Sequence, residues 1–131
     1  MKHFDEVELA CKGSNAANVS NFGSPCGCGG SLPPAGIHPR LAKLLDDIRE
    51  TVVRPVYVTS GYRCERHNRR VGGEVNSYHM QGIAADIHCP GVSMARLAEI
   101  AIECGADGVG RYWSQDFVHV DVRGYTARWD E

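Results

Sequence analysis

This chain lacks long apolar runs, a surplus of charge of one sign, internal repeats and low-complexity tracts. Because no stretch of about 18 apolar residues exists, we expect no insertion into a membrane. Residues 1–8 carry acidic side chains where a secretory signal has an apolar core, so we expect no signal peptide. The 14 basic and 16 acidic residues nearly cancel, leaving a net charge of -2. This balance gives no electrostatic indication of nucleic-acid binding, so we expect no nucleic-acid partner.

The length and composition fit one globular domain. A chain of 131 residues is too short for two well-formed cores. Its content of 43% apolar and 23% charged residues is ordinary for globular proteins, so we expect a single, monomeric domain over residues 1–131. Residues 1–36 are rich in Gly, Ser, Asn and Pro and show little periodicity, which predicts an irregular N-terminal arm.

Cysteine is plentiful, with 6 residues in the chain. Without an export signal, free thiols are favoured over a disulfide framework. Cys26 and Cys28, with Cys11 upstream, are an alternative site for a second, structural metal ion. However, their C-x-C spacing differs from the C-x-x-C spacing that is typical of zinc knuckles. Free thiols therefore remain the favoured interpretation.

Hydrophobic periodicity and turn residues predict a mixed fold. Leu41, Leu44 and Ile48 recur at helical spacing, which predicts an amphipathic helix over residues 39–52. Two strand-like segments joined by Ser114 and its neighbours indicate an antiparallel hairpin. The predicted fold class is α+β, with an antiparallel sheet and flanking helices. The other predicted elements are strands at 55–60, 83–89, 108–113 and 117–123, helical turns at 63–70, and a helix at 93–104 with Ser93 as N-cap.

One group of side chains has the composition of a catalytic zinc site. His79, Asp86 and His119 would supply three ligands and leave the fourth tetrahedral position open for water. Residues two apart on a strand share a face, so His88 beside Asp86, and Asp121 beside His119, are equally placed to point inward. Spacing alone therefore leaves two candidates on each strand.

Several motifs together resemble a known family. The chain is similar, from about residue 4 to 129, to the D-alanyl-D-alanine carboxypeptidase family of zinc peptidases, which shares its fold with lysostaphin-type enzymes and the hedgehog signalling domain. The resemblance implies a hedgehog/DD-peptidase-like fold and a peptidoglycan peptidase. It rests on Ser60-Gly61-Tyr62-Arg63, His67-Asn68, Val71-Gly72-Gly73, Ser77-x-His79-x-x-Gly82-x-Ala84-x-Asp86 and Phe117-Val118-His119-Val120-Asp121.

The resemblance also implies roles for individual residues. It assigns one catalytic zinc ion to His79, Asp86 and His119, which removes the ambiguity on the strands and leaves His88 and Asp121 as neighbours of the ligands. Asp116, three residues before the last histidine, corresponds to the family's general base. Family members with the longer glutamate at this place are known, so aspartate changes the reach of this acid, and some relatives lack the acid altogether.

Two further residues correspond to substrate-contacting positions. The resemblance implies that Arg63 polarises the scissile carbonyl or holds the substrate carboxylate, a task that suits the planar, charged guanidinium. Ser77 corresponds to a serine that contacts substrate. The alternative roles are a surface ion pair for Arg63 and a turn-forming role for Ser77.

The resemblance therefore predicts an endolysin-like zinc hydrolase of the cell wall. It would cut a D-alanine-containing bond of the peptidoglycan stem peptide with zinc-bound water, as a D,D-carboxypeptidase or a murein endopeptidase. The visible sequence predicts a cytoplasmic or phage-lysin-like location. Alternatives are a non-catalytic zinc-containing cell-wall binding module of the same fold, a metal that only supports folding, and thiol catalysis through Cys64 or Cys89.

Overall fold

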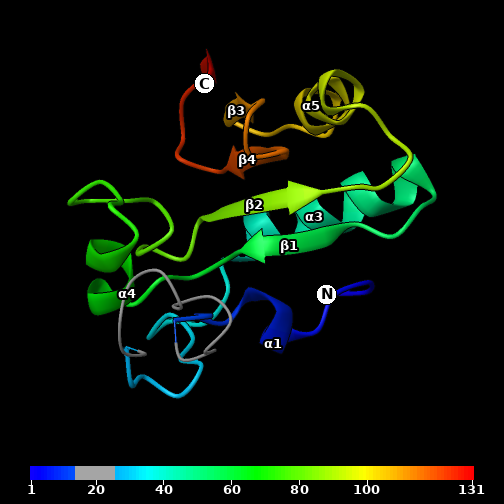
Figure 1. Ribbon diagram of the computed structural model, residues 1–131. Coiled ribbons are helices and arrows are strands. Elements are labelled where there is room, and N and C mark those ends of the chain that lie inside the picture. Colours follow the sequence, from blue (N-terminus) through cyan, green and yellow to red (C-terminus); the bar gives the residue numbers. More distant parts are fainter. Residues whose placement is uncertain (14–25) are drawn as a thin grey trace.

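The computed structural model describes residues 1–13 and 26–131 and has an α+β fold built on one sheet of five strands. The strand order across the sheet is β1-β2-β4-β3-β5. Figure 1 shows the strands with helices packed around them. The strands are β1 (Tyr57–Ser60), β2 (Ala84–His88), β3 (Gly108–Tyr112), β4 (Phe117–Asp121) and β5 (Ala127–Asp130).

The sheet is antiparallel except at one edge. β1 pairs with β2, β2 with β4 and β3 with β4 in antiparallel fashion, which confirms the predicted hairpin of β3 and β4. The prediction of a wholly antiparallel sheet was wrong, because β5 pairs with β3 in parallel. After β4 the chain reverses and passes to the far edge of β3, so its direction there matches that of β3. No strand was predicted from the sequence at the position of β5.

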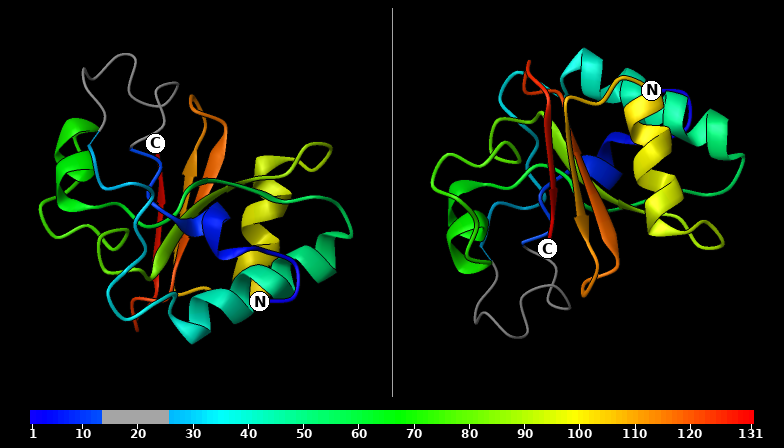
Figure 2. Two further views of the ribbon diagram at one scale, coloured as in Figure 1. Left: turned by 90° about the horizontal axis from the view of Figure 1, so that it is seen from below. Right: turned by 90° about the horizontal axis from the view of Figure 1, so that it is seen from above.

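Two helices cover one face of the sheet (Figure 2). Helix α3 (Pro39–Val52) has the predicted bounds, and His38 caps it by accepting a hydrogen bond from the Arg40 N–H. Helix α5 (Met94–Glu103) begins after Ser93, whose hydroxyl accepts from the Arg96 N–H as expected of an N-cap. In the described part of the chain, no helix has the length and apolarity needed to span a membrane.

The short helix α4 (Glu65–Arg70) lies on the opposite side of the sheet from α3 and α5 (Figure 2). The predicted irregular arm falls partly on residues 14–25, which lie outside the described residues. Within the described part of that arm, α1 (Glu6–Leu9) is a regular helical turn. Leu9 is buried and its carbonyl accepts a hydrogen bond from the Tyr62 N–H at 2.8 Å, so this segment packs on the domain.

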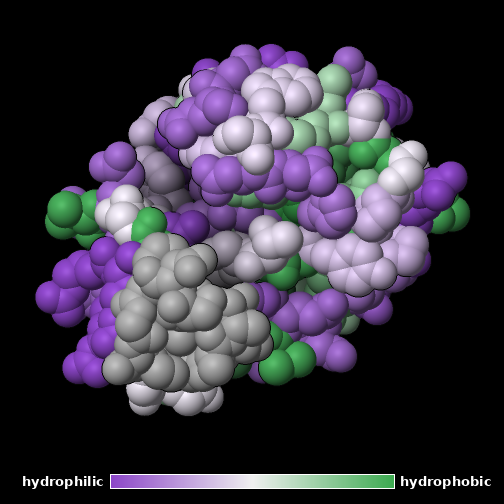
Figure 3. All heavy atoms as spheres, viewed as in Figure 1, coloured by the Kyte–Doolittle hydropathy of each residue, from purple (hydrophilic) through white to green (hydrophobic). Residues whose placement is uncertain are grey.

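Side chains along the central strands alternate between the hydrophobic core on one face of the sheet and a polar face on the other. Val118 and Val120 of β4, with Ala85 and Ile87 of β2, belong to the hydrophobic core under the helices. The residues between them, including His119, point to the other face. On the molecular face in Figure 3, hydrophobic residues form small groups between hydrophilic ones.

Candidate metal centre and substrate cavity

Three buried side chains converge on the polar face of the sheet. Asp86 of β2 and His119 of β4 are cross-strand partners, and His79 comes from the turn before β2. Asp86 Oδ1 lies 3.2 Å from His79 Nε2 and 3.0 Å from His119 Nδ1. A tetrahedral zinc ion with bonds of about 2.05 Å separates its ligand atoms by about 3.3 Å. The spacing and the donor types therefore fit a zinc ion.

Each histidine is oriented by a second hydrogen bond. His79 Nδ1 donates to the Gly61 carbonyl at 2.8 Å, and His119 Nε2 donates to Asp121 Oδ2 at 2.7 Å. With a metal ion bound, His79 Nε2 and His119 Nδ1, the nitrogens beside Asp86, would be the ones that coordinate it. A hydrogen bond of this kind on the outer nitrogen is typical of metal-ligating histidines and selects the ring tautomer.

Asp121 is fully buried and well supplied with donors. It accepts hydrogen bonds from the Gly108 N–H at 3.0 Å and from Arg123 Nη2 at 2.7 Å, besides that from His119. Burial opposes ionisation, but the hydrogen bonds from His119 and Arg123 outweigh it and hold the pKa of Asp121 well below its usual range. Asp121 is therefore an anion that holds the His119 ring in place.

The pKa values of the ligands reflect the same competition. Burial raises the pKa of Asp86, but the charges and hydrogen bonds of His79 and His119 outweigh this and lower it below the usual value. Burial lowers the pKa of His119, but hydrogen bonds to Asp121 and Asp86 raise it overall. A metal ion must displace the proton on His119, so acid competes with the metal.

A cavity of about 680 Å³ opens beside the three ligands. Arg63 and Ser77, the two predicted substrate-binding residues, both line it. The Ser77 hydroxyl also accepts a hydrogen bond from the His79 N–H at 3.2 Å, so Ser77 shapes the turn that carries this ligand. The other lining residues include Glu74, Asn76, Tyr78, Tyr112, Gln115, Phe117, Arg123, Trp129 and Glu131.

Arg63 is held over the metal centre by three hydrogen bonds. It donates from Nε to Ser60 Oγ at 3.1 Å, from Nη1 to Asn68 Oδ1 at 3.3 Å and from Nη2 to Asp86 Oδ2 at 3.4 Å. A guanidinium has five N–H donors, so two remain beyond these three bonds within the described part of the chain. Arg63 is thus positioned to offer donors to an oxygen in the cavity.

Asp116 does not join the group of ligands. Its side chain is 72% exposed, and its carboxylate lies 3.7 Å from His88 Nδ1. It lines a separate hollow with His88 and Phe117 rather than the cavity beside His79. Its φ of 57° is in the left-handed region, in the turn that enters β4. The role of Asp116 as a general base stays a prediction.

Tyr112, Arg123 and Trp129 are among the cavity residues that were not identified as site residues from the sequence. The Trp129 indole lies 5.2 Å from the His119 ring, centroid to centroid, and donates to the Tyr112 hydroxyl at 3.1 Å. A Cβ at Gly110 would lie 2.3 Å from the Trp129 ring, so only glycine leaves room for this packing. Gly108 and Gly110 within a strand were the available signal, since glycine in a strand marks a close approach.

Comparison with known proteins supports the family resemblance inferred from the motifs. Residues 2–121 match the family described as Peptidase M15. The chain belongs to this peptidase family. The match covers the segments that carry His79, Asp86 and His119, and it confirms the resemblance to zinc D-Ala-D-Ala carboxypeptidases inferred from the motifs. M15 peptidases are in general zinc-dependent, and the three ligand candidates fit that requirement.

Two relatives of this M15 peptidase carry a more specific description. Peptidoglycan L,D-endopeptidase MepK of Escherichia coli (strain K12) is 36% identical over 81 residues, which are 58% of this chain and 44% of MepK. Probable peptidoglycan L,D-endopeptidase MepK of Haemophilus influenzae is 34% identical over 72 residues, or 51% of this chain and 39% of that protein. The matched region thus covers less than half of each relative.

Proposed function

We propose that this M15 peptidase is a zinc-dependent peptidoglycan hydrolase of hedgehog/DD-peptidase-like fold that acts on the stem peptide of the cell wall. The observation that carries the proposal is the convergence of His79, Asp86 and His119 beside a cavity of about 680 Å³. A cavity of this size accepts a short peptide segment. Similarity to the MepK proteins favours an L,D bond over the D-alanine-containing bond expected from the motifs.

The metal centre would be held by His79 Nε2, Asp86 and His119 Nδ1. A zinc ion supplies Lewis acidity to the scissile carbonyl and lowers the pKa of a bound water to about 7. The chain contributes the fixed orientation of the two rings, through the Gly61 carbonyl and the Asp121 carboxylate. This preorganisation lowers the cost of arranging charged groups during the reaction.

Arg63 would bind the substrate. Its two remaining N–H groups can donate hydrogen bonds to the carbonyl oxygen as negative charge develops there, or to a substrate carboxylate, because the guanidinium stays charged at all relevant pH values. Its bond to Asp86 limits its motion, so the donors are oriented before substrate arrives. Ser77 would hold the turn that carries His79 and offers its hydroxyl to the peptide from the cavity wall.

Asp116 stays our proposed proton acceptor, since it lies three residues before His119 and adopts a left-handed conformation at the strand entrance. Backbone strain of this kind is found preferentially at functional sites. To act, its carboxylate must turn from His88 into the cavity when substrate binds. Glu74, which lines the cavity together with Glu131, is a competing acid.

Separate substitutions distinguish the two acids. We expect Asp116→Asn to lower kcat by about 10²–10⁴-fold, the usual contribution of general base catalysis, with zinc content unchanged. Glu74→Gln, the matched variant, should leave kcat within about twofold. The reverse result would assign proton transfer to Glu74.

Mass spectrometry of muropeptides tests the proposed reaction. The zinc-loaded protein is incubated with purified cross-linked and linear muropeptides, beside a sample stripped of metal and a stripped sample to which zinc has been returned. We expect cleavage at an L,D bond, lost on stripping and restored by zinc. Loss of a terminal D-alanine would instead establish a D,D-carboxypeptidase, and intact muropeptides in all samples would contradict the proposed hydrolysis.

A non-catalytic cell-wall binding module is the second candidate. The exposed position of Asp116 outside the cavity favours it, because a binding module needs no proton acceptor. Such a module would sediment with purified peptidoglycan in a zinc-dependent manner and release no fragments. Sedimentation together with fragment release would reject it.

A further inference from the structure

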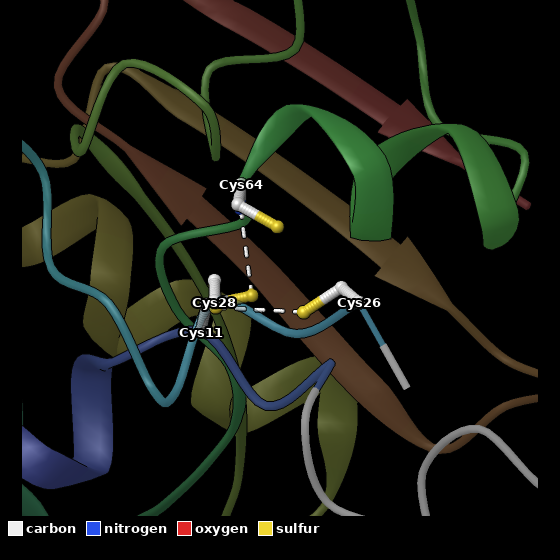
Figure 4. Close-up of side chains that lie close together, drawn as sticks. All are labelled: Cys11, Cys26, Cys28 and Cys64. Carbon is white, nitrogen blue, oxygen red and sulfur yellow. Dashed lines mark hydrogen bonds between the residues drawn. The ribbon is translucent and has the colours of Figure 1, made fainter. Parts of the chain in front are cut away.

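We propose that Cys11, Cys26, Cys28 and Cys64 bind a second zinc ion, which has a structural role. Figure 4 shows the four side chains pointing toward one another from three segments of the chain. Their sulfur atoms all lie within 4.8 Å of one another. This site is separate from the His79 centre, and its existence does not depend on the proposed hydrolytic function.

The sulfur positions fit a tetrahedral metal site. Zinc binds thiolates at about 2.3 Å, which separates the sulfurs of a four-cysteine site by about 3.8 Å. Cys26 and Cys28 place their sulfurs 3.4 Å apart, and all four lie within 4.8 Å, so one ion at the centre can reach every sulfur with small adjustments. None of the four cysteines is in a disulfide. Disulfides would draw the sulfurs into pairs at about 2.05 Å and give no reason for all four to converge.

Three of the sulfurs accept hydrogen bonds from backbone N–H groups. The Cys64 N–H donates to Cys11 Sγ, the Ser31 N–H to Cys28 Sγ and the His67 N–H to Cys64 Sγ, each at 3.4 Å. A neutral thiol is a weak acceptor, whereas a metal-bound thiolate carries the charge that attracts such donors. The surrounding backbone is therefore arranged for anionic sulfur, and Arg66 adds positive charge nearby by donating to the Cys26 carbonyl at 3.1 Å.

Glycines make the close approach possible. Gly27 has a φ of 79°, which glycine adopts without strain, and the cysteines on either side of it place their sulfurs 3.4 Å apart. A Cβ at Gly13 would lie 2.7 Å from Cys26 Sγ, so no larger residue fits there without moving the sulfur. The C-x-C spacing thus serves as a metal-binding turn although it differs from C-x-x-C.

Four protein ligands close the coordination shell. With no position left for water, the ion would have a structural rather than a catalytic role. It would tie the N-terminal segment and the loop at residues 26–31 to the start of α4. The same region supports the metal centre, because Gly61 accepts the hydrogen bond from His79, and Arg63 directly precedes Cys64. The second zinc would therefore help to position both residues.

Zinc content of the full-length protein tests this proposal. We expect two zinc ions per chain in protein prepared with zinc, and one in each of two double variants, Cys28→Ser with Cys64→Ser and His79→Ala with His119→Ala. Cys104→Ser, a control cysteine outside the cluster, should retain two. The proposal would be overturned if the parent protein bound a single zinc ion that the cysteine variant kept and the histidine variant lost. That result would still support the proposed centre at His79.

A spectroscopic measurement covers the case in which the cysteine variant does not fold. Cobalt is substituted for zinc in the His79→Ala, His119→Ala variant, which keeps all four cysteines. We expect the intense thiolate-to-cobalt charge-transfer absorption of a four-sulfur site at one equivalent of cobalt. Absence of this band, together with a mass lower by the hydrogens lost in disulfides, would show that the cysteines pair with each other and would overturn the proposal.

Discussion

The two clusters of candidate metal ligands differ in how the fold supports them. His79, Asp86 and His119 are tied to the centre of the sheet, where β2 and β4 set the spacing of two ligands through paired backbone hydrogen bonds. Cys11, Cys26, Cys28 and Cys64 lie on loops and at the start of a six-residue helix, where no sheet sets their spacing. The first cluster is positioned by the fold, and the second would itself position the chain around it.

The clusters also differ in access. The histidine centre borders a large cavity and leaves room for water and substrate. The cysteine cluster would supply four protein ligands, and Cys11 and Cys26 are buried. An open site beside a cavity suits catalysis, whereas a closed site suits stability. Removing ligands from each cluster should therefore change different properties of the protein.

Removal of a histidine ligand should have the largest effect. His119→Ala should lower kcat/KM by at least about 1,000-fold, since a catalytic metal supplies several kcal/mol and each 1.36 kcal/mol is tenfold. Circular dichroism and the cysteine-bound zinc should be unchanged. The assay is hydrolysis of purified muropeptides, with His3→Ala, an exposed histidine far from the cavity in sequence, as the control. Activity within tenfold of the parent protein would exclude His119 as a metal ligand.

Removal of a cysteine ligand should act mainly on stability. Cys64→Ser should lower Tm by about 8 °C or more, if loss of the zinc costs about 2 kcal/mol or more. Thermal unfolding is compared with that of Cys104→Ser under reducing conditions, so that disulfides do not contribute. Equal Tm values for the two variants would mean that Cys64 stabilises the protein no more than a cysteine outside the cluster, which would contradict a stabilising metal site.

Loss of the Asp121 charge should weaken the histidine centre without destroying it. Asp121→Asn weakens the acceptor for His119 Nε2 and should reduce zinc affinity by about 10–100-fold, the usual effect of such outer partners. Competition with a chromophoric chelator measures the zinc affinity. The affinity of the cysteine cluster for its zinc ion should be the same in the variant as in the parent protein. Unchanged affinity would mean that Asp121 supports only the packing of Arg123.

The smallest effect is expected at Gly110. Gly110→Ala places a methyl group within contact of the Trp129 ring and should cost about 1–3 kcal/mol by overpacking. Trp129 would move away from His119, which tryptophan fluorescence can detect in a Trp113→Phe background. Gly105→Ala adds a methyl group where space is open, although its φ of 97° adds strain, and it should leave this fluorescence unchanged. A Trp129 signal identical to that of the parent would show that the cavity wall tolerates the methyl group.

Most of the fold was predictable because local patterns agree with tertiary packing. Leu41, Leu44 and Ile48 recur at helical spacing and are buried in the core as expected. The edge strand β5 has one partner strand and alternates half-buried with exposed residues, so its short sequence carries little hydrophobic signal. Its parallel pairing depends on the path of the chain around β3, which no local pattern contains.

The candidate site was predictable where one motif carries its residues. His79 and Asp86 lie in one short motif, and the structure brings them together with His119. The direction of the Asp116 side chain depends on the backbone conformation of its turn, which the spacing to His119 does not reveal. Cys64 joins Cys26 and Cys28 across a long sequence separation, so local spacing could not identify it as their partner.

Turnover during zinc titration of the metal-free protein tests the central claim most directly. The His3→Ala control and the Cys28→Ser, Cys64→Ser variant are titrated in parallel, with muropeptide cleavage followed at each step. We predict that hydrolysis by the cysteine variant rises in proportion to zinc and stops rising at one equivalent, bound at His79, Asp86 and His119. Saturation of that centre with zinc in folded protein without any cleavage of muropeptides would contradict the account.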